Sequence, residues 1–160
     1  MKSLANKYMH SRLSLKQRGL AAVEAVVVLP VLLLSLFATV EIGNAILHYN
    51  TLTQSVSQGA RYLANVELGT GGGVDISAQD ITSTTQLVAY GVIGTGTAIL
   101  PGFTPSDVNV QDLGDGDILV TADYEYQPLI IGGAPNVITG TRILETFTMS
   151  AGTVMSLIAR

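Results

Sequence analysis

Apolar residues dominate one long stretch near the N-terminus. Between residues 20 and 40 the only ionisable side chain is Glu24, and residues 25–40 carry no charge. A helix of this length extends about 31 Å at about 1.5 Å per residue, which is close to the hydrocarbon thickness of a bilayer. The pattern therefore predicts a transmembrane helix over residues 20–40.

Helical periodicity continues beyond that stretch. Apolar or small residues recur at alternating steps of four and three, which is a heptad-like pattern. These positions are Ala45, Tyr49, Leu52, Val56, Gly59, Leu63 and Val66. A glycine cluster from Gly69 to Gly73 then ends the helix. We expect residues 41–68 to form an extracytoplasmic amphipathic helix that packs on its own C-terminal domain or on other subunits.

Residues 69–160 are predicted to form an α+β domain. The Ser77 to Asp80 segment resembles a capping box and predicts a shorter helix to about Val92. Its expected inner face comprises Ile81, Thr85, Val88 and Val92.

Strict alternation of apolar and polar residues over 118–126 predicts a strand. Asp115-Gly116 predicts a hairpin that joins this strand to one through Val108 and Val110. A third strand is expected over residues 143–154, with Phe147, Met149 and Ala151 on one face. This small antiparallel sheet of about three strands would bury the amphipathic half of the long helix in a pilin-like α+β arrangement.

Charge is divided unevenly along the chain. Five basic residues precede Gly19 without any acid, whereas the remainder carries three basic residues against twelve acids. Positive flanks favour the cytoplasmic side, so we expect a cytoplasmic N-terminus and a C-terminal body across the membrane. An acidic body argues against a nucleic acid partner. The chain has no cysteine, which excludes disulfides and thiolate chemistry.

Three interpretations of the apolar stretch compete. A secretory signal peptide would be cut at its far end, but the stretch is long and Ala38-Thr39-Val40 is a poor cleavage site. An uncleaved signal anchor explains the apolar residues but not Glu24. A prepilin-type signal would be cut before the apolar stretch, after Gly19.

The prepilin interpretation gives Glu24 a role. An acid within a transmembrane helix costs about 2.5–3.5 kcal/mol on insertion scales. Cleavage after Gly19 would make Leu20 a positive N-terminus, four residues before Glu24 and on the same helix face. Between packed helices, the carboxylate of one subunit would then meet the terminal amine of its neighbour and set the axial register. The small Gly19 suits a peptidase at the cut.

Four segments, taken in order, resemble the TadE-like family of pseudopilins or minor pilins from tight-adherence (Flp, type IVc) pilus systems. They are Arg18-Gly19-Leu20-Ala21-Ala22-Val23-Glu24, Val28-Leu29-Pro30-Val31-Leu32-Leu33, Glu41-Ile42-Gly43 and Gly59-Ala60-Arg61-Tyr62. The resemblance covers roughly residues 17–63. Related processing motifs have an aromatic residue after the acid, where this chain has Ala25.

The resemblance implies a subunit of the bacterial inner membrane with a periplasmic domain. Its leader, residues 1–19, would be removed by a prepilin peptidase, and Leu20 would be open to N-methylation. Its expected partners are the membrane, the peptidase, other pilins and the assembly platform, and its destination can be an extracellular adhesive pilus. The alternative is an uncleaved, single-pass, membrane-anchored extracytoplasmic binding protein in which Glu24 is incidental.

Several further residues have assigned expectations. Pro30 predicts a mild kink within the apolar helix. Tyr49 and Gly59 are candidates for packing, and Arg61 with Tyr62 is a candidate pair that anchors the helix to the body.

No arrangement of residues predicts catalysis or a cofactor, so we expect a protein that is not an enzyme. Asp112, Asp115 and Asp117 cluster at the hairpin tip, where calcium would favour the oxygen ligands. Turn chemistry explains them equally well, the spacing is not that of an EF-hand, and no metal is expected.

Overall fold

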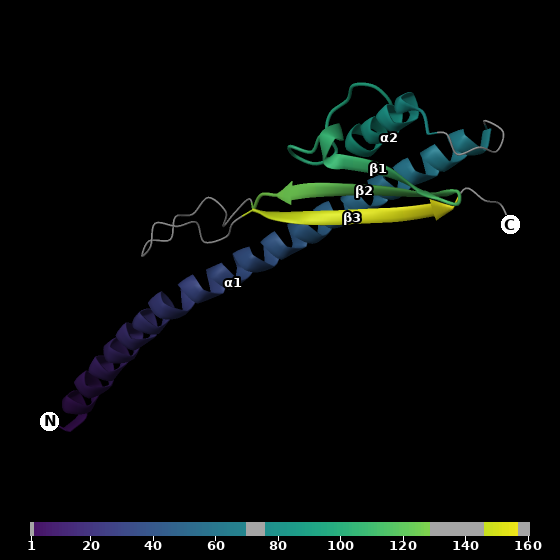
Figure 1. Ribbon diagram of the computed structural model, residues 1–160. Helices are drawn as coiled ribbons and strands as arrows, with labels where there is room; N and C mark the ends of the chain where they lie inside the picture. Colours follow the sequence, from purple (N-terminus) through teal and green to yellow (C-terminus); the bar gives the residue numbers. More distant parts are fainter. Residues whose placement is uncertain (1, 70–75, 129–145, 157–160) are drawn as a thin grey trace. The chain divides into compact units, whose positions relative to one another are not determined.

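The computed structural model describes residues 2–69, 76–128 and 146–156 (Figure 1). Its elements follow the order α1 (Lys2–Gly69), α2 (Ala78–Tyr90), a short 3-10 turn η1 (Pro105–Asp107), β1 (Val108–Gly114), β2 (Asp117–Tyr126) and β3 (Phe147–Ser156). The chain divides into two units, residues 1–40 and 41–160. The predicted α+β class is confirmed, with one long helix, one shorter helix and three antiparallel strands.

The first unit consists only of the part of α1 that ends at Val40. Almost all of its described side chains are exposed, although most are large and apolar, as Val26, Leu34 and Phe37 illustrate. The helix has the length and composition needed to cross a membrane. The hydroxyl groups among its described side chains are satisfied locally, because Ser35 and Thr39 donate to the carbonyls of Val31 and Ser35 at 2.9 Å. Such bonds suit an apolar surrounding, which offers no water as a partner.

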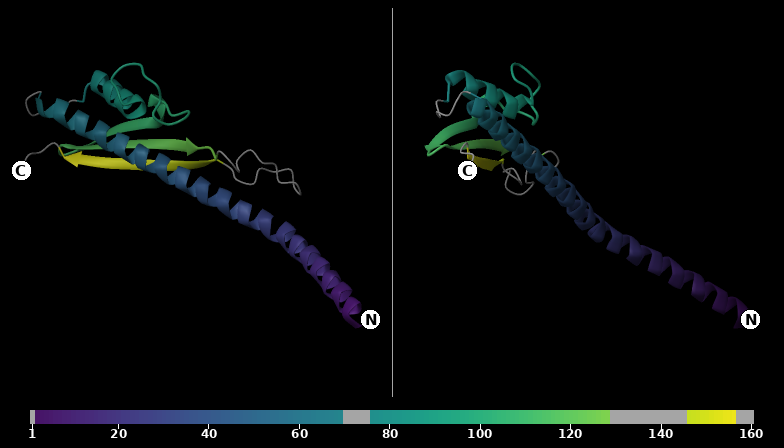
Figure 2. Two further views of the ribbon diagram at one scale, coloured as in Figure 1. Left: turned by 180° about the vertical axis from the view of Figure 1, so that it is seen from behind. Right: turned by 90° about the vertical axis from the view of Figure 1, so that its right-hand side faces the viewer.

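The second unit packs its sheet and α2 on the second half of α1, as the views of Figure 2 show. One hydrophobic cluster joins the three parts. Its largest fully buried apolar side chains are Leu52, Val56, Leu63, Val88, Phe103, Ile118, Val120 and Tyr126. The expectation that the heptad-like positions of the helix pack on its own domain is therefore confirmed for Leu52, Val56 and Leu63.

Tyr49 is one of the heptad-like positions, but it remains 47% exposed. Tyr49 lies beside Phe147 and Met149 of β3, which is an edge strand of the described sheet. Glu41, which the pattern did not include, is buried instead. Burial along α1 thus depends on where the sheet lies as well as on the helical period.

Helix α2 begins as the sequence predicts and ends earlier. The Ser77 hydroxyl accepts a hydrogen bond from the Asp80 backbone N–H at 3.2 Å and caps the N-terminus. Gly91, in the left-handed conformation with φ 70°, ends the helix before Val92, and its N–H donates to the Leu87 carbonyl.

The predicted inner face of α2 is confirmed at Val88 and wrong at Ile81 and Val92, while Thr85 is half-buried. Ile81 and Val92 are exposed, whereas Thr84, Val88 and Ala89 are buried. The reason is the contact with α1. A Cβ placed on Gly59 would lie 2.3 Å from Val88 Cγ2 and 3.5 Å from Thr84 Cγ2, so the glycine allows this face of α2 to approach.

The sheet has the order β1-β2-β3, and both pairs are antiparallel. Asp115 and Gly116 have positive φ and form the predicted two-residue hairpin turn between Gly114 and Asp117. The Gly114 N–H donates to Asp112 Oδ1 at 2.8 Å, which is turn chemistry. The third strand begins at Phe147, and the earlier part of its predicted range, residues 143–145, lies outside the described residues.

Replacing Gly59 by alanine should destabilise the second unit. The new methyl group would overlap Val88, which overpacks the core at a cost of about 1–3 kcal/mol. Urea unfolding of the full chain in detergent, followed by the near-ultraviolet circular dichroism of its tyrosines, measures the change.

Gly43→Ala is the matched control, because a Cβ at Gly43 meets no atom within 4 Å. That variant should unfold at the wild-type urea concentration or slightly above it, since alanine favours helix over glycine. Val88→Ala should recover part of the loss in Gly59→Ala. Equal stability of the two glycine variants would contradict the close contact.

Candidate functional site

Glu24 lies on the surface of α1, surrounded by apolar side chains. Its neighbours Val23, Val26 and Val27 are each more than 60% exposed, and Glu24 is also exposed. Gly19 and Leu20 lie in the same helix, about one turn earlier. A carboxylate on such a surface needs a partner wherever water is excluded. The structure therefore presents Glu24 as a group available for contact outside the chain.

Pro30 also lies inside α1, within the apolar segment. A proline in a helix leaves the carbonyl four residues earlier without its usual N–H donor. The mild kink expected from the sequence remains a prediction.

Glu41 is the first residue of the second unit, and it is only 6% exposed. The Tyr126 hydroxyl donates a hydrogen bond of 2.6 Å to Glu41 Oε1. The Asn44 side-chain N–H in turn donates to the Tyr126 oxygen at 3.1 Å. Tyr126 is the last residue of β2, so these bonds fasten the end of that strand to α1.

Three more contacts between ring side chains extend this polar cluster. The Tyr124 hydroxyl lies 3.3 Å from His48 Nδ1, and the His48 ring meets the Tyr126 ring edge-on with 5.2 Å between centroids. The Phe147 ring is tilted against the Tyr126 ring, also with 5.2 Å between centroids. The alternation over residues 118–126 puts both tyrosines on one face of the strand, but it does not indicate their partners on α1.

The electrostatics keep both tyrosines in their neutral form. Burial raises the pKa of Tyr124. Burial also raises the pKa of Tyr126, and the hydrogen bond to Glu41 raises it further, while the Asn44 bond acts in the opposite direction. A neutral hydroxyl is the form that can donate to the Glu41 carboxylate. The cluster therefore joins β2 to α1 through the hydroxyl groups of neutral tyrosines.

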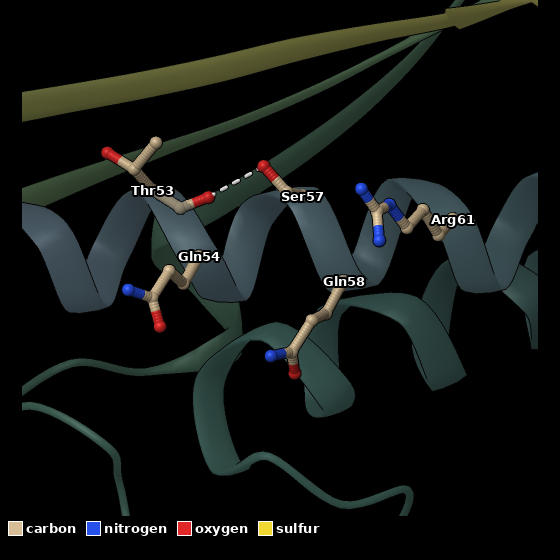
Figure 3. Close-up of a pocket in the computed structure, with 5 residues that line it drawn as sticks. All are labelled: Thr53, Gln54, Ser57, Gln58 and Arg61. Atoms are coloured by element: carbon tan, nitrogen blue, oxygen red, sulfur yellow. Dashed lines mark hydrogen bonds between the residues drawn. The ribbon is translucent and has the colours of Figure 1, made fainter.

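Arg61 lies exposed beside a shallow polar depression of about 240 Å³ on α1. Its other lining residues are Thr53, Gln54, Ser57 and Gln58, shown in Figure 3. Ser57 donates to the Thr53 carbonyl at 2.9 Å, and its oxygen lies 3.3 Å from Thr153 Oγ1 on β3. Figure 3 shows the two glutamines pointing to one side of the helix and Thr53 with Ser57 to the other, so these polar groups do not converge.

The remaining sequence candidates are also placed. Tyr62 is partly buried, and Gly59 is the point at which α2 approaches α1. Asp115 is exposed at the hairpin tip. Across the described ranges, no three histidine, aspartate or glutamate side chains are placed to share a metal ion.

A family model described as TadE-like protein matches residues 19–61. This is 43 of the 160 residues, and it confirms the resemblance drawn from the sequence over that segment. The match contains Gly19, Glu24, Pro30 and Glu41, whereas α2 and the sheet lie outside it. Comparisons with curated proteins and with solved structures gave no match.

Removing the Tyr126 hydroxyl should destabilise the second unit more than removing the Tyr124 hydroxyl. Tyr126→Phe deletes a short bond to a buried carboxylate, which is worth about 1.5–3 kcal/mol. Tyr124→Phe deletes only a longer bond to His48 and serves as the control. Urea unfolding of both variants, and of each combined with Glu41→Gln, measures the coupling. Equal losses in the two single variants, or no coupling between Tyr126 and Glu41, would rule out the proposed fastening.

Alkaline pH should weaken the second unit through the same residue. Since the folded-state pKa of Tyr126 is raised, the unfolded chain ionises first, near pH 10. This contribution is fully present below about pH 10 and is lost as pH rises towards the folded-state pKa. The free energy of unfolding should therefore fall with pH above about 10, less steeply in Tyr126→Phe. Identical slopes for that variant and the wild type would contradict the assignment.

Proposed function

We propose that this chain, TadE-like over residues 19–61, is a minor pilin or pseudopilin that takes part in assembling a Tad/Flp-type adhesive pilus. In this proposal a prepilin peptidase removes residues 1–19. The observation that carries the proposal is the exposed Glu24 within an apolar helix, at the prepilin spacing from Gly19 and inside the matched segment.

The energetics favour an assembly role for Glu24. The acid costs about 2.5–3.5 kcal/mol in the membrane. A carboxylate and an amine 4 Å apart attract by about 4 kcal/mol at an effective dielectric constant near 20. Contact with the Leu20 amine of a neighbouring subunit would therefore offset the cost of the acid. The carboxylate also suits the positive end of a helix that begins at Leu20.

The proposed location follows from the helix and its flanks. Residues 20–40 would cross the inner membrane, with the basic N-terminus in the cytoplasm and the second unit in the periplasm. The apolar exposed surface of the first unit and its locally paired hydroxyls support this placement. The peptidase, other pilins and the assembly platform are the proposed partners.

Processing predicts a mature protein that begins at Leu20. Coexpression with a prepilin peptidase and intact mass spectrometry should show the loss of residues 1–19. Gly19→Leu should block cleavage, because the site needs a small residue before the cleaved bond and leucine is large. An unprocessed chain in cells with an active peptidase would contradict the proposed cleavage and favour the uncleaved, membrane-anchored binding protein.

Glu24→Ala should separate processing from assembly. Its mature N-terminus should match the wild type, while pili sheared from the cell surface should decrease at least tenfold, because the charge pair is lost. Glu24→Asp should recover part of this decrease because it keeps the charge. Val27→Ala is the control, since it changes an exposed apolar residue nearby. Normal pilus numbers in Glu24→Ala would rule out the assembly role.

A further inference from the structure

An apolar groove of about 300 Å³ lies between α1 and the start of β3. Its lining residues are Ile42, Ala45, Ile46, Tyr49, Phe147 and Met149, none of which is charged. Ile42 and Ile46 are more than half exposed, and Tyr49 and Phe147 are each 47% exposed. A soluble surface seldom gathers side chains of this kind in one place unless something covers them.

The surroundings of the groove on α1 also lack exposed charge. Between Ala25 and Ala60 the only acidic or basic residue, apart from His48, is Glu41. That carboxylate is withdrawn from the surface and accepts the Tyr126 hydrogen bond. His48 is itself partly buried against the tyrosines of β2. The next charged side chain on the helix is Arg61.

The groove follows the proposed membrane span in sequence, since Ile42 comes two residues after Val40. Residues 42–49 rise about 10 Å along a helix, and apolar faces of interfacial segments enter the headgroup and acyl boundary by about 5–10 Å. Aromatic residues such as Tyr49 and Phe147 are enriched at that level.

We propose that this groove, formed by α1 beside β3 immediately after the span, is seated in the boundary layer of the outer leaflet and is covered by lipid. The inference rests on the membrane anchoring in the proposed function. An anchored monomer has the bilayer as the apolar phase within its reach before it meets any other subunit. Lipid is therefore the occupant that the continuity with the span favours.

The absence of cysteine makes single labelling sites available. The full chain carrying Ile46→Cys or Phe147→Cys, labelled with NBD, is reconstituted in phosphatidylcholine and phosphatidylglycerol vesicles. Asn109→Cys is the water-exposed control on β1, and Leu33→Cys is the control within the span. Lipids with a doxyl group near the headgroup should quench positions 46 and 147 at least twofold more than position 109. Lipids with a deeper doxyl group should quench position 33 most.

The controls separate the failure of this inference from the failure of anchoring. Quenching at positions 46 and 147 equal to that at 109, with position 33 still quenched, would overturn the lipid-covered groove alone. Loss of quenching at position 33 would overturn the anchoring and the groove together. Shielding of both groove positions from water without doxyl quenching, increasing with the protein-to-lipid ratio, would show a second copy as the occupant and overturn the inference.

Discussion

The hydrogen bond between Tyr126 and Glu41 joins the last residue of β2 to α1 at the start of the second unit. A carboxylate in an apolar setting needs a partner, and Glu24 and Glu41 of this helix meet that need differently. Glu41 is buried and has its partner within the fold. Glu24 is exposed among valines, and the proposed partner lies on another subunit. The contrast supports an external role for Glu24, because the same helix shows how an acid with an internal role is satisfied.

The second half of α1 packs against both α2 and the sheet. Gly59 has no side chain, so Val88 of α2 can approach the helix backbone, while Leu52, Val56 and Leu63 enter the core shared with the sheet. Strand β2 supplies the opposite surface through its alternation, in which Ile118, Val120 and the residues that follow at every second position are buried. At the end of the same face of β2, Tyr124 and Tyr126 add polar contacts to His48 and Glu41 of α1.

Local signals in the sequence predicted much of this fold. The Ser77 cap and the Asp115-Gly116 turn each act through backbone geometry within a few residues, so they can be recognised without the fold. The spacing of Gly19 and Glu24 is also read from the sequence alone, and its role in processing and assembly stays a prediction. The helical period alone missed Thr84 and Ala89 on the inner face of α2 and did not indicate that Tyr49 stays 47% exposed, because both depend on which element lies opposite. The Glu41–Tyr126 bond joins residues 85 positions apart, and no local pattern indicates such a pairing.

The same bond also determines which residues of β3 lie near the start of the second unit. Tyr126 pairs with Phe147 across the strands, and their rings are 5.2 Å apart. Holding Tyr126 on Glu41 therefore holds Phe147 beside Ile42 and Ile46. A contact that hides the one acidic side chain of α1 between Ala25 and Ala60 thus also assembles an apolar surface. A lipid boundary disfavours an exposed carboxylate and favours exposed apolar side chains. The hydrogen bond removes the first and positions the second, so its effect extends beyond the stability of the domain.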